Sequence, residues 1–286
     1  MRHPVQVIQP GFYTTVQDGG RKGYRHWGVP ISGPMDHLNF TLANSLLGNP
    51  PEAALLECTL HGPTLLFNAP SRVVVTGAPI ELLRDGQPML MYHAIDCDLG
   101  TVLTLGKMMV GMRTYIAFQG GLATQKILGS HSYYFPVTPE KVLEKGALLP
   151  LKSMDKKIFQ SLTVPPTEWI GTARELAVLP GPDWAKLPTQ LQDQIMSSDF
   201  KIGSNDRMGY QIKGGLPTNR FSFPSSFVLP GTVQLTPEGS LLVAMADGQV
   251  TGGYPRILFL ETPEAAKLAQ LRTGQSLRFR WDELSD

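Results

Sequence analysis

Ser-Leu-Arg-Phe-Arg-Trp, residues 276–281, alternates apolar with charged or polar side chains. In an extended chain, successive side chains point to opposite faces, so Leu277, Phe279 and Trp281 are expected on a buried face and the two arginines in water. A period of two over six residues predicts a strand whose sheet has one face in the core.

Working outward from this stretch, short runs rich in β-branched and aromatic residues recur along the chain. Glycine (29 residues) and proline (24 residues) separate these runs, and long helical periods are rare, which is typical of a mainly β protein. Asp85-Gly86 lies between two such runs and predicts a hairpin turn, because both residues tolerate positive φ. The other predicted strands are residues 5–9, 72–76, 80–84, 102–105, 113–119, 176–179, 232–235, 241–246 and 257–261.

Three short helices are expected among the strands. The clearest covers residues 36–47, where Asp36 can accept the first free N–H groups and Gly48 can close the last turn in a left-handed conformation. The other two are expected to begin near Pro188 and Pro263, because proline is well tolerated in a first helical turn.

The length of 286 residues allows two ordinary β domains. Residues 153–172 contain two adjacent prolines and no steady period, so they are expected to connect an N-terminal β half, residues 1–152, to a C-terminal β half, residues 173–286.

Composition excludes several classes of function. Lys plus Arg number 25 and Asp plus Glu 24, a net charge of +1, so a nucleic-acid or membrane-surface partner is not expected. The apolar runs are too short to span a bilayer, and the first residues lack the apolar region of a signal peptide.

The two cysteines, Cys58 and Cys97, have no CxxC spacing, which favours a reducing compartment, and the cytoplasm is predicted. The six histidines show no HxH or HExxH pattern, so no metal site is predicted.

Two polar, glycine-bearing segments of the N-terminal half are candidates for chemistry. Residues 14–23 include Gln17, Asp18 and Arg21, and a carboxylate near an arginine can aim the guanidinium fork at a substrate carboxylate or phosphate. A local Asp18–Arg21 pair that only ties down a loop is the alternative. Residues 28–36 include Ser32 and Met35, but Ser32 has neither a GxSxG elbow nor an evident histidine partner, so it is expected to donate a hydrogen bond in a turn.

The C-terminal half contains two further segments of this kind. In residues 206–210, Asp206 and Arg207 repeat the acid and arginine theme beside Tyr210, whose ring can stack and donate a hydrogen bond; a surface ion pair at a strand start is the alternative. Residues 245–256 supply consecutive backbone N–H groups that could bind an anion, or they form a tight β connection. The candidate binding residues of this last segment are Asp247, Gln249, Thr251, Gly252, Gly253 and Tyr254.

Taken together and in order, these segments resemble the family that includes the C subunit of 5-oxoprolinase, the KipA regulator and the second allophanate-hydrolase-type segment of urea carboxylase. The matching motifs are TTVQDGGRKG (14–23), GVPISGPMD (28–36), ANSLLGN (43–49), LLE (55–57), FQGGL (118–122), LGS (128–130), LPGPD (179–183), NDRMGY (205–210), PGTVQL (230–235) and MADGQVTGGYPRI (245–257). Ten motifs in one order make the resemblance specific.

The resemblance implies two barrel-like, cyclophilin-like halves and a cytoplasmic hydrolase that opens 5-oxoproline to L-glutamate with hydrolysis of ATP. It also implies two partners from 5-oxoprolinase: a B subunit of the KipI type and an A subunit of the LamB type. Which of these chains binds ATP is left open. Lys107 lies in the sequence Gly-Lys-Met-Met, where methionine follows and does not precede the lysine, so this chain is expected to carry no biotin.

On this basis Asp18, Arg21, Asp206 and Arg207 are the predicted catalytic residues, with the two arginines binding a carboxylate or phosphoryl oxygen of a small-molecule substrate. Two alternatives are a regulatory protein that antagonises a KipI-like kinase inhibitor and the carboxyltransferase component of a biotin-dependent urea-type carboxylase. The sequence departs from the family pattern at residues 131–134 and 225–227.

Overall fold

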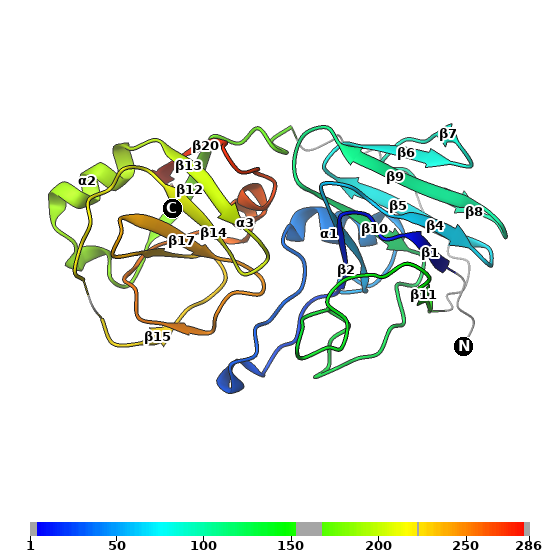
Figure 1. The fold of residues 1–286 in the computed structure, drawn as a ribbon, viewed down its shortest axis with the longest axis horizontal. Coiled ribbons are helices and arrows are strands. Elements are labelled where there is room, and N and C mark those ends of the chain that lie inside the picture. Colours follow the sequence, from blue (N-terminus) through cyan, green and yellow to red (C-terminus); the bar gives the residue numbers. More distant parts are fainter. Residues whose placement is uncertain (1–4, 153–167, 222, 283–286) are drawn as a thin grey trace. The chain divides into compact units, whose positions relative to one another are not determined.

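The computed structural model of this chain describes residues 5–152, 168–221 and 223–282. The chain divides into two compact units: residues 1–22 with 32–170, and residues 23–31 with 171–286 (Figure 1). Residues 23–31, although near the N-terminus, belong to the second unit, where the Arg25 guanidinium donates to the carbonyl oxygen of Val228. The predicted connector, residues 153–172, falls largely outside the described residues.

The first unit contains two antiparallel sheets. One has the strand order β11-β1-β4-β9-β6-β7 and the other the order β2-β3-β10-β5-β8. The strands of the first sheet are β1 (Val5–Gln9), β4 (Thr64–Phe67), β6 (Ile80–Arg84), β7 (Gln87–Pro88), β9 (Val102–Met108) and β11 (Leu148–Leu149). Those of the second sheet are β2 (Tyr13–Gln17), β3 (Leu55–Thr59), β5 (Ser71–Gly77), β8 (Ile95–Cys97) and β10 (Arg113–Phe118).

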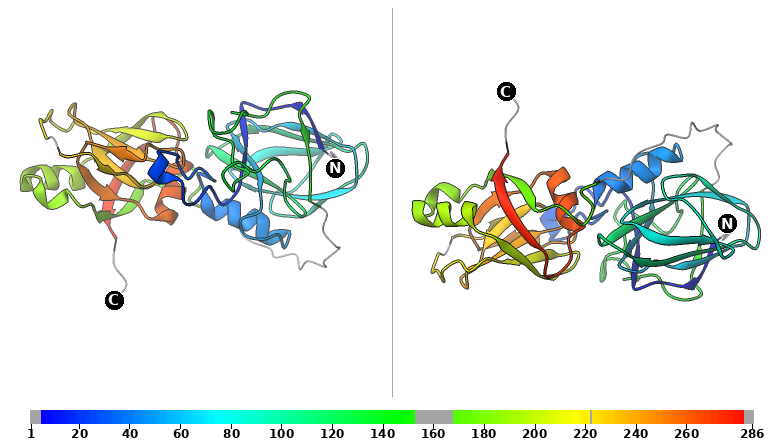
Figure 2. Two further views of the ribbon diagram at one scale, coloured as in Figure 1. Left: turned by 90° about the horizontal axis from the view of Figure 1, so that it is seen from below. Right: turned by 90° about the horizontal axis from the view of Figure 1, so that it is seen from above.

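Side chains from both sheets form one apolar core, in which Val5 and Val7 of β1 cluster with Val73 and Val75 of β5. Because alternate residues of a strand face opposite sides, Val74 points the other way and packs against α1 (His37–Leu46). Figure 2 shows α1, in light blue, on the outside of the first unit's strands.

The second unit is built on a closed barrel with the strand order β12-β19-β16-β17-β14-β13-β20. Its pairs are antiparallel except that β12 runs parallel to β20, and buried aliphatic residues such as Ile212, Val233 and Val243 fill it. The barrel strands are β12 (Glu175–Pro180), β13 (Phe200–Asn205), β14 (Gly209–Lys213), β16 (Thr232–Leu235), β17 (Ser240–Ala244), β19 (Arg256–Phe259) and β20 (Ser276–Trp281). The remaining elements of this unit are η1 (Arg25–Trp27), η2 (Trp184–Lys186), α2 (Thr189–Ser197), α3 (Thr262–Ala269) and the small pair β15 (Ser226–Phe227) and β18 (Thr251–Gly252).

The predicted mainly β fold with three short helices is confirmed. The Asp36 carboxylate accepts the N–H of Asn39 at 3.0 Å at the start of α1, and Gly48 closes that helix with φ 62°. The predicted turn is also present, with Asp85 at φ 51° and Gly86 at φ 78° between β6 and β7.

Two expectations were wrong in detail. Residues 14–17 were not among the predicted strands, but they belong to strand β2, which pairs with β3. Their side chains are mostly polar yet buried, so no alternation of apolar and polar residues indicated the strand. Trp281 was expected on a buried face but is 42% exposed, and its ring meets the edge of Trp184 with 5.2 Å between centroids. No helix among the described residues is both long and apolar enough to cross a membrane.

Candidate functional site

In the first unit, Asp18 follows directly after β2 and is buried. Its Oδ1 accepts from the N–H of Gly20 at 3.0 Å and from the hydroxyls of Ser130 at 2.5 Å and Ser132 at 2.8 Å. Its Oδ2 accepts from the N–H of His131 at 2.6 Å. Burial raises the pKa of the Asp18 carboxyl, but these four hydrogen bonds outweigh it and hold the pKa below its usual value.

Arg21 is fully buried and holds the same segment of chain. Its Nη2 donates to the carbonyl oxygen of Ser132 at 2.5 Å and its Nε to that of Ile127 at 3.5 Å. Its Nη1 donates to the hydroxyl of Ser32 at 3.1 Å, so Ser32 accepts a hydrogen bond here, where donation was expected. Asp18 and Arg21 therefore both fix residues 127–132.

The other predicted residues of this unit are buried beside these two. Ser32 has φ 59°, a left-handed conformation at the turn before Gly33. Met35 donates its N–H to the Glu57 carboxylate at 2.7 Å, which fastens the loop before α1 to β3. The Gln17 side chain donates to Thr15 Oγ1 at 3.0 Å. These contacts place Ser32, Met35 and Gln17 in the interior of the unit.

In the second unit, Arg207 pairs with Asp247. Arg207 Nε lies 2.7 Å from Asp247 Oδ2 and Nη2 lies 3.3 Å from Oδ1, a bidentate pair in which both side chains are almost completely buried. The N–H of Asp247 also donates to the carbonyl oxygen of Arg207 at 2.8 Å. This pair joins residues 206–210 to residues 245–256, the two candidate segments of the C-terminal half.

Asp206, next to Arg207 in the sequence, has a different role. Its carboxylate is exposed and accepts the N–H groups of Met208 at 2.7 Å and Gly209 at 3.1 Å, which stabilises the turn between β13 and β14. Tyr210 is fully buried and its hydroxyl contacts the carbonyl oxygens of Ala269 at 3.3 Å and Leu271 at 3.4 Å. Tyr210 therefore binds the end of α3 to the barrel.

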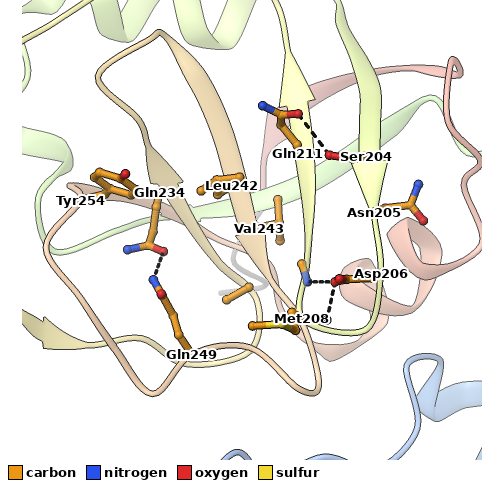
Figure 3. Close-up of a pocket in the computed structure, with 12 residues that line it drawn as sticks. Ser204, Asn205, Asp206, Met208, Gln211, Gln234, Leu242, Val243, Gln249 and Tyr254 are labelled. Atoms are coloured by element: carbon orange, nitrogen blue, oxygen red, sulfur yellow. Dashed lines mark hydrogen bonds between the residues drawn. The ribbon is translucent and has the colours of Figure 1, made fainter. Parts of the chain in front are cut away.

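A pocket of about 310 Å³ lies beside this turn on the barrel (Figure 3). Strand register creates it: Gln211 on β14 is opposite Leu242 on β17, which is opposite Gln234 on β16. Since paired residues point to the same face, these three side chains form a row. Figure 3 shows Gln211 with Ser204 on one side of Leu242 and Val243, and Gln234 with Gln249 on the other. The pocket is thus an apolar floor between two hydrogen-bonded polar pairs, and we call it the amide-lined pocket.

One amide nitrogen in the amide-lined pocket is buried and finds no hydrogen-bond partner among the described residues. Gln234 Oε1 accepts from Gln249 Nε2 at 3.3 Å, whereas Gln234 Nε2 is buried and has no hydrogen-bond partner among the described residues. A buried, unpaired N–H donor costs free energy unless a ligand or water satisfies it. Gly252 borders the two amides: a Cβ there would come within 2.8 Å of Gln249 Nε2 and 2.9 Å of Gln234 Nε2.

Sequence reasoning found part of this pocket. The predicted residues Asp206, Gln249 and Tyr254 line the pocket. Met208 and Gly209, from the same segment as Asp206, line it as well. Thr251 and Gly252 form strand β18, and Gly253 follows it. Gln234, Gln211 and Ser204 were missed. The strand period places Gln234 on the outer face of β16, but only the fold shows that residues 249–254 bury it.

Two relatives with curated names match nearly the whole chain. The chain is 33% identical to the C subunit of 5-oxoprolinase from Escherichia coli over 96% of this chain and 90% of that protein. It is 28% identical to "Urea amidolyase" of Saccharomyces cerevisiae over 96% of this chain but 16% of that protein. The model of the family described as "Carboxyltransferase domain, subdomain A and B" matches residues 27–281.

The chain belongs to this carboxyltransferase-domain family. Two solved structures have a similar fold over nearly the whole of this chain. The TTHA0988 structure superposes with a TM-score of 0.88 at 28% identity, covering 97% of this chain and 56% of that one. The Kluyveromyces lactis urea carboxylase superposes with a TM-score of 0.83 at 26% identity, covering 96% of this chain and 27% of that one. In both structures the part that matches this chain belongs to a longer chain.

Proposed function

We propose that this chain is the C subunit of an assembly that opens 5-oxoproline to L-glutamate with hydrolysis of ATP, acting with partners of the KipI and LamB types. The observation that carries the proposal is the 33% identity to the corresponding E. coli 5-oxoprolinase chain, which extends over 96% of this chain and 90% of the relative. A match over nearly the full length of both chains supports equivalence of the whole polypeptide.

The chemistry explains the need for ATP. A five-membered lactam is a poor electrophile, and transfer of a phosphoryl group to its oxygen converts that oxygen into a far better leaving group. A first water then attacks the ring carbon and the ring C–N bond breaks, which leaves the nitrogen as an amine and the carbon as an acyl phosphate. A second water hydrolyses the acyl phosphate to the side-chain carboxylate of glutamate and inorganic phosphate. The chain that binds ATP is not assigned.

The amide-lined pocket is the substrate site that we assign on this chain. A lactam is neutral at its reacting end and carries one N–H donor and one C=O acceptor, which is a match for a pocket lined by carboxamides. Gln234 Nε2, buried and without a described partner, would donate to the lactam oxygen. Leu242, on the same face of the sheet as Gln211 and Gln234, would contact the ring methylenes.

The charged segments take supporting roles in this proposal. Arg207 and Asp247 hold the loop that carries Gln249 and Tyr254, and Asp18 and Arg21 hold residues 127–132. The catalytic assignment of Asp18, Arg21, Asp206 and Arg207 stays a prediction.

Reconstitution tests the function. The chain is mixed with its KipI-type and LamB-type partners, and glutamate release from 5-oxoproline is followed with and without ATP. ATP-dependent release that needs all three chains supports the proposal. An intact complex without release contradicts it and favours the regulatory alternative.

A second function has its own support, because relatives named urea amidolyase and urea carboxylase also match 96% or more of this chain. A carboxyltransferase component would exchange a carboxyl group between biotin, carried on another chain, and an amide such as urea. Carboxylation of urea by the chain with a carboxylated biotin carrier, and no glutamate release from the three mixed chains, would select this function.

A further inference from the structure

The first unit contains a second pocket, of about 360 Å³, that the proposed function does not use. Segments far apart in the sequence form it: residues 18–20 after β2, residues 50–53 before β3, the loop around residues 126–131, and Lys152 after β11. All belong to the same compact unit. We call it the two-lysine pocket, because Lys126 and Lys152 both line it.

The cations of the two-lysine pocket have no carboxylate partner among the residues that the structure describes. Both lysines are exposed at its rim, and neither forms an ion pair with a carboxylate among the described residues. The acidic groups of the pocket, in contrast, are already bound. Asp18 accepts four hydrogen bonds, and Glu52 pairs with Lys22 at 2.5 Å.

His131 supplies an independent sign of a ligand. It is only 6% exposed and lines the pocket. Its Nδ1 lies 3.3 Å from Thr124 Oγ1, whereas its Nε2 is buried without a hydrogen-bond partner in the described part of the chain. A buried ring nitrogen that the protein leaves unpaired is costly unless a bound group completes it.

We propose that the two-lysine pocket binds a small oxyanion, the phosphate or carboxylate group of a ligand, between the ammonium groups of Lys126 and Lys152 and the Nε2 of His131. The two lysines supply the charge and the imidazole supplies a directed donor. This site concerns the first unit alone and does not depend on the oxoprolinase activity.

Binding should be coupled to protonation of His131. Burial lowers the pKa of the imidazole, Asp18 opposes this shift, and the nearby Lys152 and Lys126 lower the pKa further. Of the other charged groups near His131, Glu52 and Lys22 form a pair with each other, and the buried Arg21 guanidinium donates to the carbonyl oxygens of Ile127 and Ser132. An oxyanion seated between the lysines reverses their effect and raises the pKa, so the complex takes up a proton. Affinity therefore rises as the pH falls through the pKa of the complex and becomes constant below that of the free protein.

The test uses the full chain with sulfate, as a stand-in for a phosphate group, and acetate, as a carboxylate, because neither titrates between pH 6 and pH 8. The imidazole ¹³C resonances are followed, and the His131 signal is assigned with His131→Gln. We expect one or both anions to shift that signal saturably and to bind about tenfold more tightly at pH 6 than at pH 8. Sulfate alone would assign a phosphate group, and acetate alone a carboxylate.

Lysine variants decide whether the pocket itself is responsible. Lys126→Met and Lys152→Met should each weaken anion binding about fivefold or more. Lys107→Met, an exposed lysine on β9 outside the pocket, should leave it unchanged. Absence of any saturable shift with either anion, or anion binding in both pocket variants as strong as in the wild type, would overturn the proposal.

Discussion

Arg21 and Arg207 occupy equivalent places in the sequence pattern, each close behind an aspartate in a glycine-bearing segment, yet the fold uses them differently. The Arg21 fork donates to two backbone carbonyl oxygens and a serine hydroxyl. The Arg207 fork forms a bidentate pair with Asp247, forty residues along the chain.

The difference shows that an aspartate close to an arginine in the sequence does not specify which groups either side chain binds in the folded protein. The Asp18 carboxylate accepts four hydrogen bonds from Gly20 and residues 130–132. The Asp206 carboxylate stabilises the turn that follows it. A carboxylate near an arginine in sequence is free to bind closer N–H and O–H groups, and the buried guanidinium then takes whichever acceptors the tertiary fold brings.

The largest expected effect concerns Asp247. Asp247→Ala leaves the Arg207 charge buried without this carboxylate, and the free energy of unfolding should fall by about 3 kcal/mol, measured by urea denaturation. Removing both charges in Arg207→Met/Asp247→Leu should cost less than removing Asp247 alone, because no buried charge is then left uncompensated. A double variant at least as unstable as Asp247→Ala would contradict the ion-pair account.

The second prediction concerns Asp18. Asp18→Asn turns one acceptor oxygen into an NH₂ group among four donors. The free energy of unfolding should therefore fall by about 2 kcal/mol at pH 7. Because the folded-state pKa of Asp18 is lowered, its contribution is complete above the unfolded pKa of about 3.9 and is lost as the pH falls through the folded value.

Urea denaturation from pH 7 down to pH 3 checks this second expectation. The gap between wild type and Asp18→Asn should narrow in acid. A gap that stays constant over the whole range would show that the Asp18 carboxylate is not held in the charged form.

A smaller effect sharpens the contrast between sequence neighbours. Asp206→Ala removes two hydrogen bonds from an exposed turn, and it should cost about 1 kcal/mol in the same denaturation experiment. A loss as large as that of Asp247→Ala would mean that Asp206, and not Asp247, supports the buried arginine.

Much of the fold could be predicted because local signals were strong. The alternation of residues 276–281, the helix signals at Asp36 and Gly48, and the Asp85-Gly86 turn all depend on neighbours in sequence. Strand β2 was harder to predict, since Thr14, Thr15 and Gln17 are polar but buried. Burial of such residues is decided by pairing with β3, which no local pattern reveals.

The sequence identified pocket residues only in segments that contain both glycine and charged residues. Asp206, Gln249 and Tyr254 stood out in the sequence and line the amide-lined pocket. Gln234 carried no such mark, because a glutamine on the outer face of a strand is ordinary until another segment covers it. His131 was noted only as a departure from the family pattern, and its unpaired Nε2 emerges from tertiary packing.

The most direct test of the central claim is the effect of Gln234→Glu on kcat/KM for 5-oxoproline in the complex of all three chains. The change keeps the shape of the side chain but removes the amide donor, so kcat/KM should fall about fivefold or more, equivalent to about 1 kcal/mol. The matched variant Gln194→Glu on α2, outside the pocket, should retain wild-type kinetics. Equal kcat/KM for wild type and Gln234→Glu would contradict the assignment of the amide-lined pocket as the substrate site.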